Sequence, residues 1–519
     1  MLKRTLYHFH FCCGLGGGAK GFNRSRPRVG NVEAHWECLG GIDVDAGVLR
    51  DFAKLAGVPG TQLDLFTRDQ YIRFHGKEPP ADWREATPED IRRAAGGKRP
   101  DCVFISSPCK GASGLLSEEK AKTPRYQALN ELTLRCIWLM GEAWADDPVP
   151  LIAFENVPRL ATRGRHLLDQ IGQLLGHYGF ANAETTHDCG ELGGLAQSRK
   201  RFLLVARNIE KVPAFLYEPE KKSLRAVGDI LGRMPLPGDI EAAGPMHRVP
   251  SLQWRTWVRL ALVRAGSDWR SLNELVIEDG HLRDLVIVPE YRSGYMGVHG
   301  WDDTAGTIAG RSGPTNGAFS VADPRPNWNR HSGNYRVIRY DQPAGTIIAG
   351  GKGVQGGQQS VADPRILHRG KGDNYLTGGH YGVIGFNQHS GAIAASSRYD
   401  SGRFSVADPR IPAADERLTC IIRSLDGTWH RPFTTLEKAA LQSLVEPEEY
   451  LVLDGMSDKD WSERIGNAVP PHAAEAIADV MGTTLLLAEQ GETFRLSKTP
   501  IWVRNVAVAL SVSQPAESR

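Results

Sequence analysis

The chain has 519 residues, of which 41% are hydrophobic and 24% are charged, and this composition excludes a disordered or fibrous protein and allows two or three domains. Its 62 basic and 60 acidic residues leave a formal net charge of +2, so a nucleic-acid site would have to be a local basic face. The eight cysteines include no Cys-x-x-Cys pair, which argues against a disulfide framework and a zinc ribbon. No apolar run approaches the roughly 18 residues of a membrane-spanning helix. We expect a soluble, cytoplasmic protein with no bound metal.

The first 210 residues alternate apolar runs with helical patterns. Strands are predicted at 6–13, 102–105, 151–154 and 202–206, and apolar residues recur at helical spacing over 130–145 and 167–175. This alternation predicts an α/β domain with a largely parallel sheet covered by helices.

The second half of the chain contains an internal repeat. The hexapeptide Ser-Val-Ala-Asp-Pro-Arg occurs at 320–325, 360–365 and 405–410, and related segments precede the copies at 301–308, 340–347 and 386–393. A stack of small β units and a set of ligand-contacting loops are equally compatible with such a repeat. Helices are predicted at 252–265 and 472–488, and the tail from 497 gives no functional signal.

A glycine-rich turn with Gly14, Gly16 and Gly17 follows the first predicted strand. Glycines at such a turn let the backbone approach a nucleotide-like ligand, although close helix packing explains them equally well. Asp43 and Asp64 follow later apolar segments. Their carboxylates are suited to ribose hydroxyl and adenine amino groups, while a cap or turn is the simpler interpretation.

Three further motifs lie at predicted strand ends. Cys109, in Ser-Ser-Pro-Cys-Lys-Gly, is placed for nucleophilic attack, and Glu155, in Glu-Asn-Val, for proton donation to a ring nitrogen. Arg199 and Arg201 alternate before the last strand, so both guanidinium groups face one side. The alternatives are an inert buried thiol, a helix cap and a solvated edge strand. A last motif, Arg-Ile-Gly-Asn-Ala-Val-Pro-Pro at 464–471, precedes the final helix.

In this order the motifs resemble those of the cytosine-C5 DNA methyltransferases, over residues 6–207 and about 417–488. The resemblance implies a Rossmann-like S-adenosylmethionine-dependent methyltransferase domain at 1–210 and a β-rich target-recognition region with the three repeats at 211–415. Late motifs at 416–490 would return to the catalytic domain, before a tail at 491–519. Related members carry an aromatic-Asp-x-Pro-x-x-Thr-Ile segment before the late motif, and the repeats look like multiplied copies of it.

The resemblance also implies residue roles. Cys109 corresponds to the nucleophile, Glu155 to the residue that engages N3 of cytosine, and Arg201 with Arg199 to the contact with its carbonyl or the phosphates. S-adenosylmethionine would be held by a set of residues from five motifs: Phe11, Gly14, Leu15, Gly16, Gly17, Asp43, Asp64, Pro108, Asn467 and Val469. The chain departs from the family where it has His10-Phe11-Cys12 in place of Asp-Leu-Phe, and Lys110 in place of Gln.

The implied activity is methyl transfer to C5 of a cytosine flipped out of duplex DNA, through a Cys109 adduct at C6. We expect double-stranded DNA as the partner, a monomer, and no membrane association; a cognate restriction endonuclease is a further partner that a restriction-modification role allows. The alternatives are a tRNA cytosine-C5 methyltransferase, a catalytically silent DNA-binding protein and, last, a nicotinamide-dependent oxidoreductase. We further expect a phosphate-facing basic surface formed by residues near the first and fourth motifs: Lys20, Arg24, Arg26, Arg28, Arg199, Lys200, Arg201 and Arg207.

Overall fold

The computed structural model describes residues 1–108, 123–214, 216–267, 381–395, 397–412, 426–491 and 501–503, together with residues 271, 275 and 424 and short strands between 277 and 423. Its largest element is an eight-stranded sheet made of β1 (Leu2–Phe11), β2 (Arg28–Val29), β3 (Val32–Asp43), β4 (Thr61–Gln62), β5 (Cys102–Ile105), β6 (Leu151–Asn156), β7 (Phe180–Asp188) and β8 (Lys200–Asn208). The order is β2-β3-β1-β5-β6-β8-β7, with β4 beside β3. Strands β4, β3, β1, β5 and β6 pair in parallel, whereas β8 runs antiparallel to both β6 and β7.

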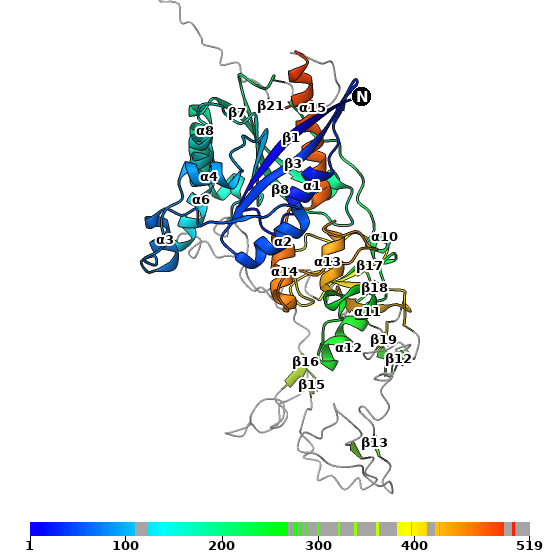
Figure 1. Cartoon of the computed structure of the whole chain (residues 1–519). Coiled ribbons are helices and arrows are strands. Elements are labelled where there is room, and N and C mark those ends of the chain that lie inside the picture. The colour runs from blue at the N-terminus through cyan, green and yellow to red at the C-terminus, as the bar shows by residue number, and fades with distance from the viewer. Residues whose placement is uncertain are drawn as a thin grey trace, which may run out of the picture.

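Helices cover both faces of this sheet (Figure 1). One face packs on α3 (Arg68–His75), α4 (Pro88–Ala94), α6 (Pro124–Ala143), α7 (Leu160–Arg163) and α8 (Arg165–His177). The other face packs on α1 (Gly17–Arg24), α9 (Cys189–Gly193) and α15 (Pro471–Glu489), with α2 (Ala46–Ala56) alongside α1. The predicted Rossmann-like α/β class is therefore confirmed. The predicted strands and helices all appear, but β7 and the reversed direction of β8 were not predicted, because β7 lacks a regular apolar alternation.

The late helix α15 lies directly against α1, which connects the last motif to the first (Figure 1). Two glycines of α1 make the close approach possible. A Cβ atom on Gly17 would lie 2.2 Å from the carbonyl oxygen of Val469, and one on Gly21 would lie 2.3 Å from that of Pro471 and 2.6 Å from the Cβ of Ala474. Helix packing thus requires glycine at these two positions.

A smaller region adjoins this domain. It contains a five-stranded sheet in the order β12 (Val286–Val288), β19 (Ile421–Arg423), β20 (Trp429–Pro432), β18 (Ser405–Asp408) and β17 (Val383–Gly385). The associated helices are α10 (Gly228–Leu231), α11 (Ile240–Ala243), α12 (Trp254–Leu262), α13 (Thr435–Leu441) and α14 (Asp458–Asn467), with a 3-10 turn at Pro245–His247. Two-stranded pairs are β10 (Ile277–Glu278) with β11 (His281–Leu282), β13 (Val298–His299) with β14 (Ser320–Val321), β15 (Val337–Arg339) with β16 (Ser360–Ala362), and β9 (Leu216–Tyr217) with β21 (Ile501–Val503). The expected second, smaller sheet region is thus present, and its bounds as a domain stay a prediction.

A chain of hydrogen bonds lies buried between β1 and α1. The amide nitrogen of Asn23 donates to the carbonyl of Ala56 (2.8 Å), which leaves its Oδ1 to accept from Nε2 of His8 (2.9 Å). Nδ1 of His8 must then accept from Nε2 of His10 (2.8 Å). Burial lowers the pKa of His8 to about 4 and the pKa of His10 well below its usual value, so both rings are neutral.

The same two histidines and Cys38 offer ligand atoms within 4.8 Å of one another. A metal ion would have to displace the hydrogen bond between the two rings, so we interpret the group as a hydrogen-bonded chain. In the described part of the protein, no helix is both long enough and apolar enough to cross a lipid bilayer.

Substitution of Gly21 by alanine should destabilise the fold. The new methyl group would collide with backbone atoms of α15, and we expect the free energy of unfolding to fall by about 1–3 kcal/mol. Gly176→Ala is the matched control, because nothing lies within 4 Å of the added Cβ in helix α8, and it should be neutral or slightly stabilising. Denaturant unfolding of both variants measures the difference; equal stability would contradict the packing argument.

The buried histidine chain should make the fold sensitive to acid. Because the pKa of His8 is about 4 in the folded chain and about 6.5 when unfolded, the unfolded state binds the extra proton between these values. Stability should therefore decrease as the pH falls from about 6.5 to about 4, by about 3 kcal/mol from His8.

The free energy of unfolding, measured against pH, should show a smaller slope in His8→Gln than in the unchanged protein. His166→Gln, at an exposed position of α8, should leave the slope as it was. An unchanged slope in His8→Gln would show that the pKa of His8 does not differ between the folded and the unfolded state.

Candidate active site

The predicted site residues lie at the carboxyl edge of the parallel strands. The strand register aligns Phe11 at the end of β1 with Ile42 of β3 and Ile105 of β5, and Ile105 with Phe154 of β6. The segments that follow, at 12–17, 43–45, 106–108 and 155–157, therefore begin side by side. This edge is where open α/β sheets bind their ligands.

Glu155 is the central polar group of this edge. Its Oε1 atom accepts from Nε of Arg201 at 2.7 Å, and its Oε2 atom accepts from the hydroxyl of Ser106 at 3.1 Å. The Glu155 side chain is only 9% exposed and that of Arg201 15%. An ion pair with a hydroxyl donor on the second oxygen fixes the carboxyl group in one orientation.

The segment that leads to Cys109 is anchored to the same neighbours. The amide of Ser106 donates to the carbonyl of Phe11 at 3.2 Å, and the side-chain amide of Asn156 donates to the carbonyl of Ser107 at 3.2 Å. The Ser107 hydroxyl also contacts that of Thr133 on α6. Pro108, predicted to contact the cofactor, continues this segment at the sheet edge and is half-buried. Cys109 and Lys110 lie outside the described residues.

Arg199 takes a different position from its neighbour Arg201. It is 1% exposed and donates to backbone carbonyls of the third repeat and the late motif: Ile393 (2.7 Å), Gly466 (2.8 Å) and Ala468 (3.0 Å). Burial, followed by the neighbouring Arg201, lowers the pKa of Arg199 to about 9. These contacts make Arg199 a positioning residue here, and a direct contact with substrate stays a prediction.

The glycine turn has an unusual backbone. Cys12, Gly14 and Gly16 have φ values of 50°, 53° and 92°, and a non-glycine residue adopts such an angle only at a cost. The amide of Gly14 donates to Asp43 at 3.1 Å, and no atom lies within 4 Å of a Cβ built on Gly14. Packing explains Gly16, whose Cβ would meet Phe52 at 3.1 Å, but the open space beside Gly14 is available to a ligand.

Asp43 closes the other side of this turn. Its carboxylate also accepts from the amide of Asp45 at 3.2 Å, and burial raises its pKa. Asp64 accepts from the amide of Phe66 (2.9 Å) and the indole of Trp83 (3.1 Å). These bonds give both aspartates the structural roles that sequence analysis considered as alternatives, without excluding a ligand contact.

The remaining predicted cofactor residues are not all brought to the open edge. Phe11 is fully buried and packs edge-on against Phe9 with ring centroids 5.5 Å apart, and Leu15 is 1% exposed within the core of the smaller region. Asn467, at the end of α14, is exposed. Val469 is buried, with its carbonyl against Gly17. The late motif thus meets the first motif, as the resemblance implied.

Sequence analysis did not identify three residues that lie in or next to the candidate site. Ser106 orients Glu155, and Asp188 binds the amides of Gly190 (2.8 Å) and Arg199 (2.6 Å), which fixes the loop before β8. Val44 is 62% exposed, directly after Asp43. An apolar residue next to a strand-end carboxylate is a usable signal for this last position.

The predicted phosphate-facing basic surface is wrong for Arg199 and Arg207, and two more of its eight members make internal contacts. Arg207 and Arg199 are buried, and Lys20 donates to the carbonyl of Leu444 at 3.0 Å. Arg24 pairs with Glu446 (2.9 Å) and Glu475 (3.3 Å) across the contact between α1 and α15. The local positive charge at these positions serves internal contacts, so they do not form one DNA-facing patch.

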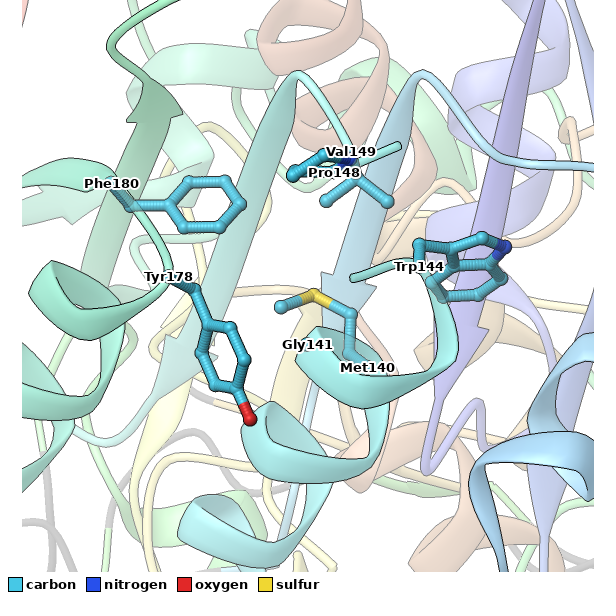
Figure 2. A pocket seen from close by; sticks show the side chains of 7 residues that line it. All are labelled: Met140, Gly141, Trp144, Pro148, Val149, Tyr178 and Phe180. Atoms are coloured by element: carbon cyan, nitrogen blue, oxygen red, sulfur yellow. The ribbon is translucent and has the colours of Figure 1, made fainter. Parts of the chain in front are cut away.

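A small apolar hollow lies at the opposite end of the sheet, near the start of β6 (Figure 2). It is lined by Met140, Gly141, Trp144, Pro148, Val149, Tyr178 and Phe180, and its volume is about 10 Å³. This space admits no more than a water molecule. It is therefore a packing gap, and the open carboxyl edge remains the candidate site.

No family model matches the chain, and no curated protein matches it either. Among solved structures, the chain is similar to the Entamoeba histolytica methyltransferase EhMeth, with 11% identity, a TM-score of 0.44, and coverage of 92% of this chain and 98% of that chain. A protein of an E. coli prophage, assigned as a DNA modification methyltransferase, gives 14% identity, a TM-score of 0.44, and coverage of 93% and 99%. The S. pombe Dnmt2 methyltransferase gives 11% identity, a TM-score of 0.43, and coverage of 94% of this chain and 99% of that chain. These structural neighbours are methyltransferases, and at such identities and TM-scores the likeness is limited to the general path of the chain.

Proposed function

We propose that the protein is a DNA cytosine-C5 methyltransferase that uses S-adenosylmethionine. The observation that carries the proposal is the Glu155 carboxyl group, held by Arg201 and Ser106, next to the segment that continues into Cys109. Attack at C6 of cytosine requires a thiol, which the sequence offers as Cys109, and proton donation to N3 requires an oriented carboxyl group. The order of the sequence motifs supports the same assignment.

The residues at the first turn fit a nucleoside cofactor. Gly14 leaves open space, Asp43 presents a carboxylate beside it, and Val44 and Asn467 are exposed. These residues would hold S-adenosylmethionine between the first and late motifs. When bound, this cofactor supplies the electrophilic methyl group of a sulfonium.

The protein residues would carry out the remaining steps. The Cys109 thiolate adds to C6, and Glu155 engages N3, so the charge that develops on the ring is neutralised while C5 becomes nucleophilic. Arg201, which pairs with Glu155, would contact the base carbonyl. After methyl transfer, loss of the C5 proton to a base or bound water lets the thiolate leave. The cytosine must first be flipped out of the duplex, at a cost of a few kcal/mol.

The proposal extends to the cellular setting. We expect double-stranded DNA as substrate, a cytoplasmic location, and action as a monomer. The recognition of a target sequence is assigned to the region at 211–415, and a role in restriction-modification stays a prediction. The alternative substrate, tRNA, is an outcome that the first experiment below resolves.

Replacement of Cys109 by alanine should lower the rate of transfer of labelled methyl groups from S-adenosylmethionine to unmethylated DNA by at least about a thousandfold. Cys102→Ala is the control: this cysteine lies on β5 but packs against Met481 on the buried face, so its removal should leave activity near the original level. Single-base mapping of the product should place the methyl groups on cytosines in one short context. Transfer to tRNA alone, or full activity in Cys109→Ala, would refute the proposal.

Substitutions at Glu155 and at its partner Ser106 should lower kcat to different extents. Glu155→Gln should lower kcat by about 10²–10⁴-fold, because the amide retains the shape but cannot donate a proton to N3 as a carboxylic acid does. Ser106→Ala removes one hydrogen bond of 3.1 Å and should lower kcat by about two- to tenfold. Equal effects of the two substitutions in a single-turnover assay would contradict the central role of Glu155.

A further inference from the structure

The third repeat is bound to the rest of the protein through its backbone. The carbonyls of Phe386 and Gln388 accept from the amides of Gly228 (2.6 Å) and Val227 (2.5 Å). Ser390 exchanges two backbone hydrogen bonds of 2.9 Å with Ala196 and Ser198. Contacts of this kind depend little on side-chain identity. We call residues 196–199, 227–228, Leu231, Met234 and Arg431 the repeat-binding surface.

Two side chains that anchor the third repeat belong to the hexapeptide that all copies share. Asp408, from the Ala-Asp-Pro-Arg sequence, is fully buried and accepts from Arg431 at 2.7 Å, and Arg431 also binds Glu437 at 2.7 Å. Burial alone would raise the pKa of Asp408, but Arg431 and Arg410 outweigh it and lower that pKa. Arg410 reaches the carbonyls of Leu231 (2.5 Å) and Met234 (3.1 Å).

The first and second repeats carry the same residues at nearly the same spacing. The aspartate and arginine recur as Asp323 with Arg325 and as Asp363 with Arg365. The aromatic residue, Phe386 in the third copy, recurs as Trp301 and Tyr340, and the buried Ile393 recurs as Ile308 and Ile347. One further side-chain contact of the third repeat has no counterpart in the other copies: the Ser390 hydroxyl donates to the carbonyl of Ala196 at 3.2 Å, whereas the other copies have alanine at this position.

The described strands of the three repeats also pair alike. In each copy a strand that begins with valine runs parallel to the Ser-Val strand, with the pairs Val298 to Ser320, Val337 to Ser360 and Val383 to Ser405. The separation is 22, 23 and 22 residues in turn. The strand pair that the third copy presents to β20 therefore has a counterpart in each of the others.

The segment that carries the first two copies is attached at both ends next to the third repeat. The amide of Gly266 donates to the carbonyl of Val383 (2.9 Å), and the amide of Val383 donates to the carbonyl of Ser267 (3.1 Å). The segment 268–382, which contains both copies, thus leaves and returns at one point. A tethered segment of this length competes for a nearby site at a high effective concentration.

We propose that the repeat-binding surface accepts any one of the three repeats, one at a time, and that the first and second repeats are alternative occupants of the place held by the third. The ion pair with Arg431 and the backbone bonds to 196–198 and 227–228 are the common attachment. The proposal concerns binding within the chain and stands independently of the reaction that the protein catalyses.

The test uses the full-length chain with a photoreactive amino acid in place of Ala226, beside the amides that bind the repeat. In the otherwise unchanged protein, crosslinks should map to the third repeat near Gln388. Asp408→Lys places a cation against Arg431 and should expel this copy, so that crosslinks move to peptides around 303 or 342. Crosslinks that stay on the third repeat, or that vanish, overturn the proposal.

Thermal unfolding gives a second readout, which does not depend on crosslinking. Because another copy replaces the third, Asp408→Lys should lower Tm only modestly, and Asp323→Lys with Asp363→Lys should not lower it. The triple variant leaves no competent copy, and its decrease in Tm should be at least about twice that of Asp408→Lys. Additive effects across the three positions would show that the copies do not compete, and would overturn the proposal.

Discussion

The arrangement of the site depends on the buried guanidinium group of Arg199. It binds carbonyls of Ile393, Gly466 and Ala468, and so joins the loop before β8 to the third repeat and to the late motif. Its charge is compensated by these dipoles and not by water, because the side chain is 1% exposed. With a pKa near 9, the group stays protonated at neutral pH. Segments more than 190 residues apart in sequence are thereby held at one edge of the sheet.

The glycines of the first motif have two different roles: some allow close packing, and one leaves space for a ligand. Gly17 and Gly21 are required by the backbone of the late motif and α15, whereas Gly14 has a left-handed φ and open space around it. His10 stands where the resembled family has aspartate, and it donates inward to His8. Because this side chain is committed to the buried chain, polar contacts with a cofactor would come from Asp43 instead.

Sequence patterns predicted the α/β domain because its central strands are short apolar runs, and they predicted Glu155 at a strand end because its motif follows such a run. They did not predict that Arg199 and Arg201 would differ, since alternation places both on one side but says nothing of what covers that side. The cover comes from residues 393 and 466–468, which are remote in sequence. The prediction of a basic surface was wrong at several positions for a related reason. Arg24 and Lys20 have partners on segments around 444–475, and pairing between such distant segments leaves no local pattern in the sequence.

The topology also explains how a chain can carry additional repeats without disturbing the site. Residues 266–267 and Val383 are hydrogen-bonded to each other, so the two ends of the intervening segment lie side by side, and its strand β12 pairs with β19 of the smaller region. The entropic cost of closing a loop rises slowly with its length, by about 0.6 kcal/mol of free energy for each doubling. Adding or removing a copy between 268 and 382 therefore costs the fold little, provided that one copy still presents an aspartate to Arg431. Since Arg431 and Glu437 are buried together with Asp408, a surface left without any occupant would expose this ion network to water, and the tethered copies provide the nearest groups that can cover it.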